Sequence, residues 1–275
     1  MSFMQSILLG IIQGLTEFFP VSSSGHLVII ESFFKNFYRP GLLFEILLHL
    51  ATLLPVVIYY RKELYKILEG LWDWKADSAT LLGSPGRKLL FMLFIGSIPT
   101  AMIGFAFKDL FEQLFSTPFL VLLALCITGG LLWFASRRPH TDRPLEDMTI
   151  RDAVFIGIFQ GLAITPGISR SGATIAMGLF CGLDPEASAA YSFLLSIPAI
   201  SGAALLEMKD SVHLLWQPES HLMVMLAGAL FASIVGYLAI RYLVKLLAMK
   251  RLSFFAWYCW FFALSVGLFL FVVKM

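Results

Sequence analysis

The chain has 275 residues, of which 59% are hydrophobic and only 14% are charged, and its mean hydropathy is +0.83. Soluble domains are about 45–50% apolar and about 25% charged, so this composition excludes an ordinary soluble protein and indicates an integral membrane protein with many spans. The formal net charge of +2 indicates no particular partner, because in a membrane protein the position of each charge matters more than their sum.

The apolar segments of the chain are long and unbroken. Strands of a transmembrane barrel would alternate polar and apolar residues over about ten positions, so we expect an all-α integral membrane protein. The first six residues, Met-Ser-Phe-Met-Gln-Ser, lack the positively charged start of a cleavable signal peptide. The cysteines Cys126, Cys181 and Cys259 stand singly without the spacing of metal ligands, and we expect buried free thiols.

Two short apolar segments open the chain, at residues 5–19 and 27–37. A helix needs about 20 residues to cross a hydrocarbon core, so neither segment spans a membrane alone. Pro20 and the run Ser-Ser-Ser-Gly at 22–25 interrupt any continuous helix between them. The simplest geometry is re-entrant, with one half-helix entering, a polar loop near mid-depth and a second half-helix leaving. A single kinked spanning helix is the alternative.

Full spans and a second broken segment follow along the chain. The spans are predicted near residues 42–60, 88–107, 118–136, 187–207, 222–241 and 253–273, and the second broken segment at 151–183. Residues 61–87 are expected to form a long loop. The sequence therefore predicts about six transmembrane helices plus two re-entrant helix-loop-helix segments, in a single membrane domain over residues 1–275.

The two broken segments match each other at a shift of 147 residues, which is the separation of Gly10 and Gly157. The residues matched at this shift are Gly10, Gln13, Gly14, Leu15, Ser22, Ser24 and Gly25 with Gly157, Gln160, Gly161, Leu162, Ser169, Ser171 and Gly172. A second set of matches, at a shift of 132 residues, pairs Gly96 and Gly104 with Gly228 and Gly236. The chain is thus predicted to contain two repeats, over about 1–136 and 150–275.

The distribution of Lys and Arg predicts the orientation of these repeats. The loops at 61–88, 137–151 and 241–251 hold six, four and four of the 20 Lys and Arg residues. By the positive-inside rule these loops are cytoplasmic, so both termini are expected outside. Because each repeat contributes three full spans, the second is inverted relative to the first, an arrangement common in secondary transporters.

The polar loops at the two breaks are suited to an anion. Three serines, at 22–24, precede a half-helix expected to begin near Gly25, where hydroxyls cap free N–H groups and the helix N-terminus favours negative charge. Residues 169–172 repeat this pattern, and Arg170 takes the place of Ser23. A guanidinium matches phosphate oxygens two at a time, so a diphosphate would fit, although a carboxylate would fit nearly as well.

Glu17 lies four residues after Gln13, on the same face of the first half-helix. A carboxylate inside a membrane is costly and usually functional. Its candidate roles are general base, metal ligand or counter-ion of Arg170. Gln13 is a candidate ligand of a divalent ion, or else a hydrogen-bond partner of its repeat mate Gln160.

Three further titratable residues lie in the apolar segments. His26 follows the first polar loop and is a candidate catalytic residue, with a structural hydrogen bond as the alternative. Glu45 and His49 stand four residues apart in an otherwise apolar span. They either line the same cavity as Glu17 or bond to each other.

Two motifs resemble the signatures of the bacterial undecaprenyl-diphosphate phosphatases, a family linked to bacitracin resistance. The first is Gln13-x-x-x-Glu17 with Pro20-Val21-Ser22-Ser23-Ser24-Gly25-His26, and the second is Pro166-Gly167-Ile168-Ser169-Arg170-Ser171-Gly172-Ala173-Thr174. The similarity extends over the chain in length and in the order of spans. The first motif begins with Gln, where the family has Glu or Gln, so that position offers no charged metal ligand.

The resemblance implies hydrolysis of undecaprenyl diphosphate to undecaprenyl phosphate and inorganic phosphate, which recycles the lipid carrier of peptidoglycan synthesis. It also implies a divalent cation, Mg²⁺ or Ca²⁺, and a site facing the outer side of the bacterial plasma membrane. On this basis Ser23 is the expected nucleophile (with His26 as the alternative), Glu17 the base or metal ligand, His26 an acid/base partner and Arg170 the phosphate clamp. The residues expected around the phosphates are Ser22, Ser24, Gly25, Ser169, Ser171, Gly172 and Thr174.

The inverted repeat is also typical of a secondary transporter or lipid flippase, which is the main alternative function. A non-catalytic anion-binding subunit of an envelope complex is a third. The expected partners are a polyprenyl diphosphate and membrane lipids, with no nucleic acid, and homo-oligomerisation is left open. Release of phosphate from a polyprenyl diphosphate would distinguish the enzyme from a transporter.

Overall fold

The computed structural model describes residues 1–33, 42–72, 83–115, 117–139, 141–211 and 222–274. Within these ranges all regular structure is helical, which confirms the all-α prediction. The helices are α1 (Phe3–Phe18), α2 (Ser23–Phe33), α3 (Leu42–Tyr59), α4 (Arg61–Trp72), α5 (Pro85–Ala106), α6 (Lys108–Phe115), α7 (Pro118–Ser136), the 3₁₀ helix η1 (Leu145–Asp147), α8 (Ile150–Leu162), α9 (Arg170–Phe180), α10 (Pro185–Ser211), α11 (Leu222–Ala248) and α12 (Ser253–Lys274).

Five of the described helices are individually long and apolar enough to cross a membrane, namely α5, α7, α10, α11 and α12. Helix α3 meets the same criterion only together with α4, and these two helices join at a bend of 79°. The chain is therefore a multi-pass membrane protein, and its described residues include five candidate spans, or six when the bent pair is counted as one. All six predicted spans fall on these helices.

Helix α4 corrects the prediction of a loop over residues 61–87. Leu64, Ile67 and Leu71 recur at helical spacing along α4, but the intervening charged residues had concealed this amphipathic pattern. Ile67 is buried, and α4 packs against α5, which begins at Pro85. Residues 73–82 of the predicted loop lie outside the described residues.

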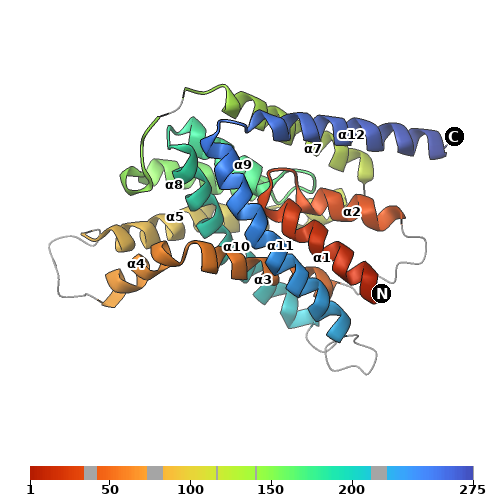
Figure 1. Ribbon diagram of the computed structural model, residues 1–275, viewed down its shortest axis with the longest axis horizontal. Coiled ribbons are helices and arrows are strands. Elements are labelled where there is room, and N and C mark those ends of the chain that lie inside the picture. The colour runs from red at the N-terminus through yellow and green to blue at the C-terminus, as the bar shows by residue number, and fades with distance from the viewer. Residues whose placement is uncertain (34–41, 73–82, 116, 140, 212–221, 275) are drawn as a thin grey trace.

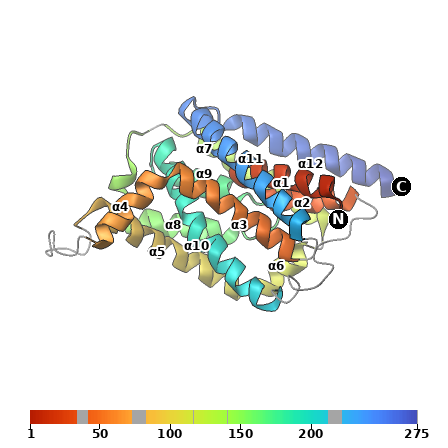
Figure 2. The same ribbon diagram turned by 60° about the horizontal axis from the view of Figure 1, so that its bottom comes forward.

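The two interrupted segments fold as hairpins that enter the molecule from opposite ends. Figure 1 shows α1 running inward from the end that carries the N-terminus, and α2 returning toward that end. Helices α8 and α9 form the second hairpin, which enters from the other end, beside α4 and α5. Figure 2 shows α3, α10 and α11 running alongside these hairpins. This geometry is re-entrant rather than a single kinked span, and the opposite entry is what an inverted repeat predicts.

Close helix contacts are mirrored between the halves of the chain. Helix α1 packs against α11 through Gly10 and Gly228, where the backbones lie so close that a Cβ on Gly10 would collide with the carbonyl of Gly228. Helix α8 packs against α5 in the same way through Gly157 and Gly96. These are the glycines that the sequence shifts pair with each other. Small residues allow such close backbone approach in membrane helices, where packing drives association.

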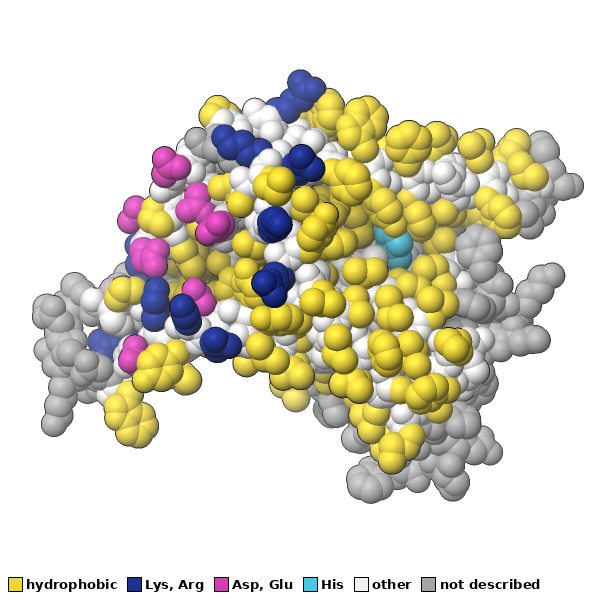
Figure 3. All heavy atoms as spheres, in the orientation of Figure 1, with side chains coloured by type: hydrophobic (Ala, Val, Ile, Leu, Met, Phe, Trp, Pro, Cys, Tyr) yellow, Lys and Arg dark blue, Asp and Glu magenta, His cyan; other side chains and the backbone are white. Residues whose placement is uncertain are grey.

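The surface separates into a charged end and a wide apolar belt. Figure 3 shows the Lys, Arg, Asp and Glu side chains gathered toward the end that contains α4 and the beginning of α8, with hydrophobic side chains over most of the remaining visible face. Large side chains such as Phe94, Met102, Leu230 and Phe261 are mostly exposed there. So much exposed apolar surface is unfavourable in water and fits contact with lipid. Both chain ends lie at the end opposite the charged one (Figure 1).

Candidate active site

The break between α1 and α2 is built by a proline and a strained serine. Pro20 follows α1, and Ser22 has a φ of +68°, in the left-handed region that costs an L-residue about 1–2 kcal/mol. The Ser22 hydroxyl accepts a hydrogen bond from the N–H of Gly25 at 3.2 Å and so caps α2. Helix α2 begins at Ser23, two residues before the expected start, because the capping residue is the first serine of the three.

The break between α8 and α9 uses a glycine for its turn. Gly167 has a φ of +93°, and the Ser169 hydroxyl caps α9 by accepting from the N–H of Gly172 at 3.0 Å. Thr128, on α7, holds this loop because its hydroxyl donates to the carbonyl of Gly167 at 3.1 Å and accepts from the N–H of Ser169 at 3.0 Å. Thr128 is buried and was not predicted as a site residue, because a single hydroxyl in an apolar span gives little signal in the sequence.

The two polar loops meet, as the repeat predicted. The Ser171 hydroxyl donates to the carbonyl of Phe19 at 3.3 Å, and Gly172 packs against Pro20. Gly25 lies against Gly167 in the same region. The N-termini of α2 and α9 therefore lie at a common junction, where the first N–H groups of each helix have no carbonyl partner within their own helix.

Glu17 lies at the centre of this junction and is 6% exposed. One carboxylate oxygen, Oε1, accepts a hydrogen bond from Arg170 Nη2 at 2.9 Å, which forms a buried ion pair between the two halves. The other, Oε2, accepts from the Ser23 hydroxyl at 2.8 Å and from Gln13 Nε2 at 2.9 Å. The structure thus brings together four of the predicted site residues around one carboxylate.

His49 approaches the same carboxylate from α3. Its Nε2 lies 3.7 Å from Glu17 Oε2, and its Nδ1 donates to the backbone carbonyl of Glu45 at 2.9 Å. The Glu45–His49 pair therefore forms through the backbone of Glu45. The His49 side chain points toward the Glu17 carboxylate.

His26 is turned away from this carboxylate. Its Nδ1 donates to the carbonyl of Ser22 at 2.8 Å, so Nε2 of the neutral ring accepts from the Tyr258 hydroxyl, also at 2.8 Å. The ring is buried and stacks on Phe262 with centroids 4.2 Å apart. Both nitrogens are thus engaged with residues other than Ser23 and Glu17, which fits a positioning role better than the expected acid/base role. Tyr258 was not predicted as a site residue, because it lies among many other aromatic residues of α12 and nothing in the sequence distinguishes it from them.

Several other residues that were predicted to bind phosphate form hydrogen bonds within the two loops or behind them. The hydroxyls of Ser22 and Ser24 lie 3.3 Å apart, and those of Ser169 and Ser171 lie 3.2 Å apart. Thr174 is completely buried behind Arg170, where its hydroxyl donates to the Arg170 carbonyl at 2.8 Å and pairs with Ser192 at 2.5 Å. The structure places Thr174 in the packing between α9 and α10, so the expectation of direct phosphate contact does not match its position.

Gln160 occupies the position in α8 that Gln13 has in α1, but it is not part of the site. Its Nε2 donates to the Thr100 hydroxyl at 3.2 Å, so the proposed Gln13–Gln160 hydrogen bond is wrong. The second copy has Ile164 where the first has Glu17, so Gln160 has no carboxylate one turn away to which it could donate a hydrogen bond. The Oε1 atoms of both glutamines are buried and have no hydrogen-bond partner among the described residues.

The arrangement places a hydroxyl, a carboxylate and a guanidinium next to one another. The Ser23 hydroxyl lies within hydrogen-bond reach of a carboxylate that can take its proton, which is the geometry required of a general base. Arg170 supplies a fixed cation, with its Nη1 3.5 Å from the Ser192 carbonyl. Two helix N-termini complete an electropositive surface around the hydroxyl. A hydroxyl beside a carboxylate and a fixed cation is the combination that acyl or phosphoryl transfer requires.

The sequence of the chain is similar to those of a known protein family. The family model described as bacitracin resistance protein BacA matches residues 6–265. The chain belongs to the BacA family. A relative in Carboxydothermus hydrogenoformans, named undecaprenyl-diphosphatase, is 40% identical over 97% of each chain. Relatives of the same name are 40% identical in Syntrophotalea carbinolica, over 96% of this chain and 100% of theirs, and 37% identical in Methanosphaera stadtmanae, over 93% and 94%. The resemblance seen in the two motifs is thereby confirmed.

Proposed function

We propose that this BacA-family protein is an undecaprenyl-diphosphate phosphatase, which converts undecaprenyl diphosphate to undecaprenyl phosphate and inorganic phosphate. The observation that carries the proposal is the hydrogen bond from the Ser23 hydroxyl to Glu17, 2.8 Å long, at a junction that also holds Arg170. The name shared by the relatives supplies the substrate. The reaction recycles the lipid carrier for cell-wall synthesis, which explains a link to bacitracin resistance.

In the proposed reaction the Ser23 oxygen attacks the terminal phosphorus while its proton passes to Glu17. The anhydride P–O bond breaks, undecaprenyl phosphate leaves with the bond electrons, and a phosphoserine forms. Glu17 passes this proton to the departing phosphate oxygen and is then free to deprotonate a water molecule. The hydroxide attacks the phosphorus of the phosphoserine, the bond between phosphorus and the Ser23 oxygen breaks, and Ser23 recovers its proton from Glu17 as inorganic phosphate is released. Phosphoryl transfer of this kind requires mainly positioning and stabilisation of charge on the phosphate oxygens.

Arg170 is proposed to bind the reacting phosphoryl group. Without substrate it pairs with Glu17, so an arriving diphosphate competes for the guanidinium. The planar group presents five donors, and an N–H that leaves Glu17 can bind a phosphate oxygen. Freed from this pair, Glu17 becomes a stronger base for Ser23. The N–H groups at the starts of α2 and α9 add further donors.

A divalent cation, Mg²⁺ or Ca²⁺, is proposed to bind with the substrate rather than in a preformed protein cage. Among the described residues no three His, Cys, Asp or Glu side chains are grouped as metal ligands. Gln13 Oε1 is buried without a partner beside the Glu17 carboxylate, and both are hard oxygen ligands. Mg²⁺ commonly binds one or two such groups plus substrate phosphates, so these residues fit. The bound cation would neutralise charge on the phosphates.

We further propose that the site faces the outer side of the plasma membrane. The charged end of the molecule would be cytoplasmic by the positive-inside rule, which places both termini outside. Repeats 1–136 and 150–275 would then form one domain with inverted topology. The prenyl chain of the substrate would extend into the surrounding lipid along the exposed apolar belt.

Hydrolysis is favoured over transport because the site contains a nucleophile and a base in contact. The deciding experiment adds a polyprenyl diphosphate to purified protein in detergent and measures inorganic phosphate. We expect turnover by the native chain and none by Glu17→Gln, which keeps the side-chain shape but removes the base. Binding or movement of the lipid without phosphate release by the native chain would establish the transporter instead.

A further inference from the structure

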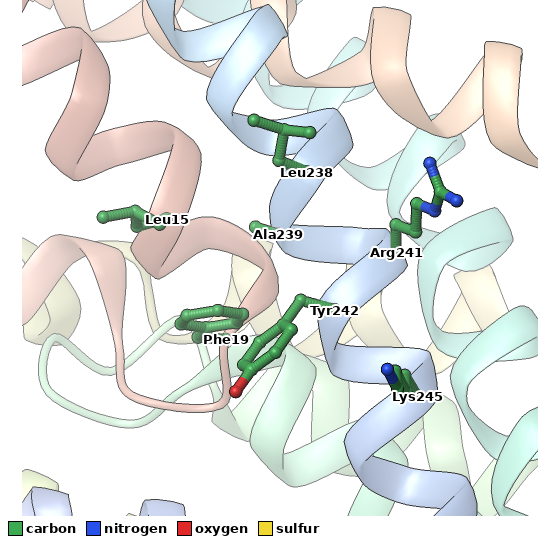
Figure 4. Close-up of a pocket in the computed structure, with 7 residues that line it drawn as sticks. All are labelled: Leu15, Phe19, Leu238, Ala239, Arg241, Tyr242 and Lys245. Atoms are coloured by element: carbon green, nitrogen blue, oxygen red, sulfur yellow. The ribbon is translucent and has the colours of Figure 1, made fainter.

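A cavity lies on the outside of the helix bundle, between the end of α1 and helix α11. It has a volume of about 490 Å³. It is lined by Leu15, Phe19, Leu238, Ala239, Arg241, Tyr242 and Lys245. Figure 4 shows Leu15 on α1 and Phe19 directly after its end as one wall, with Tyr242 beside Phe19 and the two basic side chains along α11. We call this cavity the α1–α11 groove.

The groove lies on the face of α1 that is opposite to the catalytic residues. Gln13 and Glu17 share one face of α1, because residues four apart are neighbours on a helix, and Leu15 lies on another face. Leu15 is two residues from Gln13 and two from Glu17, which corresponds to a rotation of about 200° around the helix axis. A ligand in the groove would therefore contact the back of the catalytic helix and not the carboxylate.

The walls of the groove are open to the surroundings and mostly apolar. Leu238 and Tyr242 are each 57% exposed. The Phe19 ring packs beside Tyr242 with centroids 6.3 Å apart. Leu238 and Tyr242 belong to a candidate membrane-spanning helix, and Phe19 follows the end of the neighbouring α1, so the apolar wall faces lipid hydrocarbon. An alkyl chain is the ligand that such a wall accommodates.

The groove also contains two positive charges without acidic partners. Arg241 and Lys245 lie one turn apart on α11, and neither forms a salt bridge with any Asp or Glu of the described chain. They lie in the last two turns before α11 ends at Ala248, close to the charged end of the molecule. Cations at this depth are placed where lipid phosphates lie, and Lys and Arg near helix ends extend toward that layer.

We propose that the α1–α11 groove binds an anionic glycerophospholipid of the surrounding bilayer. Its phosphate lies between Arg241 and Lys245, where the Tyr242 hydroxyl can add a donor, and one acyl chain lies against Leu15, Phe19 and Leu238. Two neighbouring cations favour an anionic headgroup over a zwitterionic one, because the latter brings its own ammonium. The occupied groove braces the last turn of α1, which carries Glu17.

The substrate or product of the reaction fits this groove less well than a glycerophospholipid does. The apolar wall is formed by only a few side chains, which suits one acyl chain rather than a C55 prenyl chain. Ser23, Glu17 and Arg170 are not among the residues that line the groove. This inference does not depend on the hydrolytic activity.

The test measures lipid retention by native mass spectrometry of the purified full chain in mixed detergent micelles. The micelles contain phosphatidylglycerol or phosphatidylcholine at equal concentration. We expect the native chain to retain phosphatidylglycerol preferentially, and Arg241→Gln combined with Lys245→Gln to weaken this binding about 30-fold. Each basic residue near an anionic lipid surface contributes about a five-fold factor, equivalent to about 1 kcal/mol.

The matched control is Arg61→Gln combined with Lys62→Gln, which removes two exposed charges from the beginning of α4, outside the groove. It should retain phosphatidylglycerol like the native chain. A second measurement, the melting temperature with and without phosphatidylglycerol, should show stabilisation in the native and control proteins and a much smaller shift in the groove variant. Equal loss in both variants, equal retention of the two lipids, or displacement of phosphatidylglycerol by equimolar undecaprenyl phosphate would each overturn the proposal.

Discussion

At the residue scale, Glu17 connects the two halves of the chain. A carboxylate buried inside a membrane protein needs compensation, and here it comes from Arg170 of the second half together with Ser23 and Gln13 of the first. The same contacts that stabilise the charge also orient it against the serine. Removing a partner outright would leave a buried charge unpaired, at a cost of about 3–5 kcal/mol. Conservative substitutions are therefore the informative ones.

Ser23→Ala tests the assignment of the nucleophile. We expect turnover to be abolished while substrate binding persists, because Arg170 and the helix N-termini remain. The measurement is phosphate release together with acid quenching of labelled enzyme, where a phosphoserine survives acid and a phosphohistidine does not. An acid-labile phosphoenzyme that persists in Ser23→Ala and disappears in His26→Ala would assign the attack to His26.

Arg170→Lys tests whether the guanidinium binds phosphate through two parallel hydrogen bonds. Lysine keeps the charge that Glu17 needs but loses the planar fork, so the protein should still fold. Loss of one preorganised donor typically lowers the rate by about 100- to 1000-fold, and we expect a decrease of that order in kcat. The melting temperature serves as the control for folding. Near-normal turnover by the lysine variant would contradict bidentate binding.

The pair His26 and Tyr258 tests positioning against acid/base catalysis. Suppose that their hydrogen bond only anchors α2 to α12. Then His26→Gln, Tyr258→Phe and the double variant should each lower kcat by the same factor of several-fold, because all three remove the same single interaction. A catalytic acid or base instead raises the reaction rate by about 10²–10⁴-fold. A loss of that size in His26→Gln, with Tyr258→Phe near normal, would restore the acid/base role.

At the scale of elements, the breaks in the helices were predictable and the contacts around them were not. Pro20 and the serine run predicted the interruption of α1 and α2, and the shift of 147 residues predicted that a second loop would meet the first. Thr128 and Tyr258 stabilise these elements from α7 and α12, but a single polar residue in an apolar span does not reveal its partner. Helix α4 was missed because its charges suggested a loop, whereas its apolar spacing is helical.

The mirrored glycine contacts give an element-scale prediction. Gly10→Val should destabilise the protein by about 1–3 kcal/mol, because the added side chain forces α1 away from the backbone of α11 at Gly228. The measurement is the melting temperature in detergent. Gly202→Ala is the matched control, since a Cβ there meets nothing within 4 Å. Equal melting temperatures for Gly10→Val and the native chain would show that this close approach does not contribute to stability.

At the scale of the whole molecule, the composition and the Lys and Arg pattern predicted more than the site motifs could. The composition indicated many spans, and the Lys and Arg pattern indicated a common side for both termini. The fold places both chain ends at the same end of the molecule, away from the charged end. The direction in which His26 points could not be predicted, because it depends on the packing of α2 against α12. Long-range packing of this kind leaves no periodic signal in one sequence.

The topology itself gives the last prediction. Single cysteines at Asp142, in the loop before α8, and at Asp109, at the beginning of α6, should react from opposite sides of the membrane in a background without Cys126, Cys181 and Cys259. Both positions lie in described parts of the chain, and α6 follows the span α5, whose other end lies beside α4 at the charged end. A membrane-impermeant maleimide added to intact cells should therefore label Asp109→Cys and leave Asp142→Cys unlabelled.

Permeabilised cells provide the control, since both variants should then react. Labelling of Asp142→Cys alone in intact cells would reverse the orientation and place the catalytic junction on the other side, while labelling of both would exclude the inverted topology.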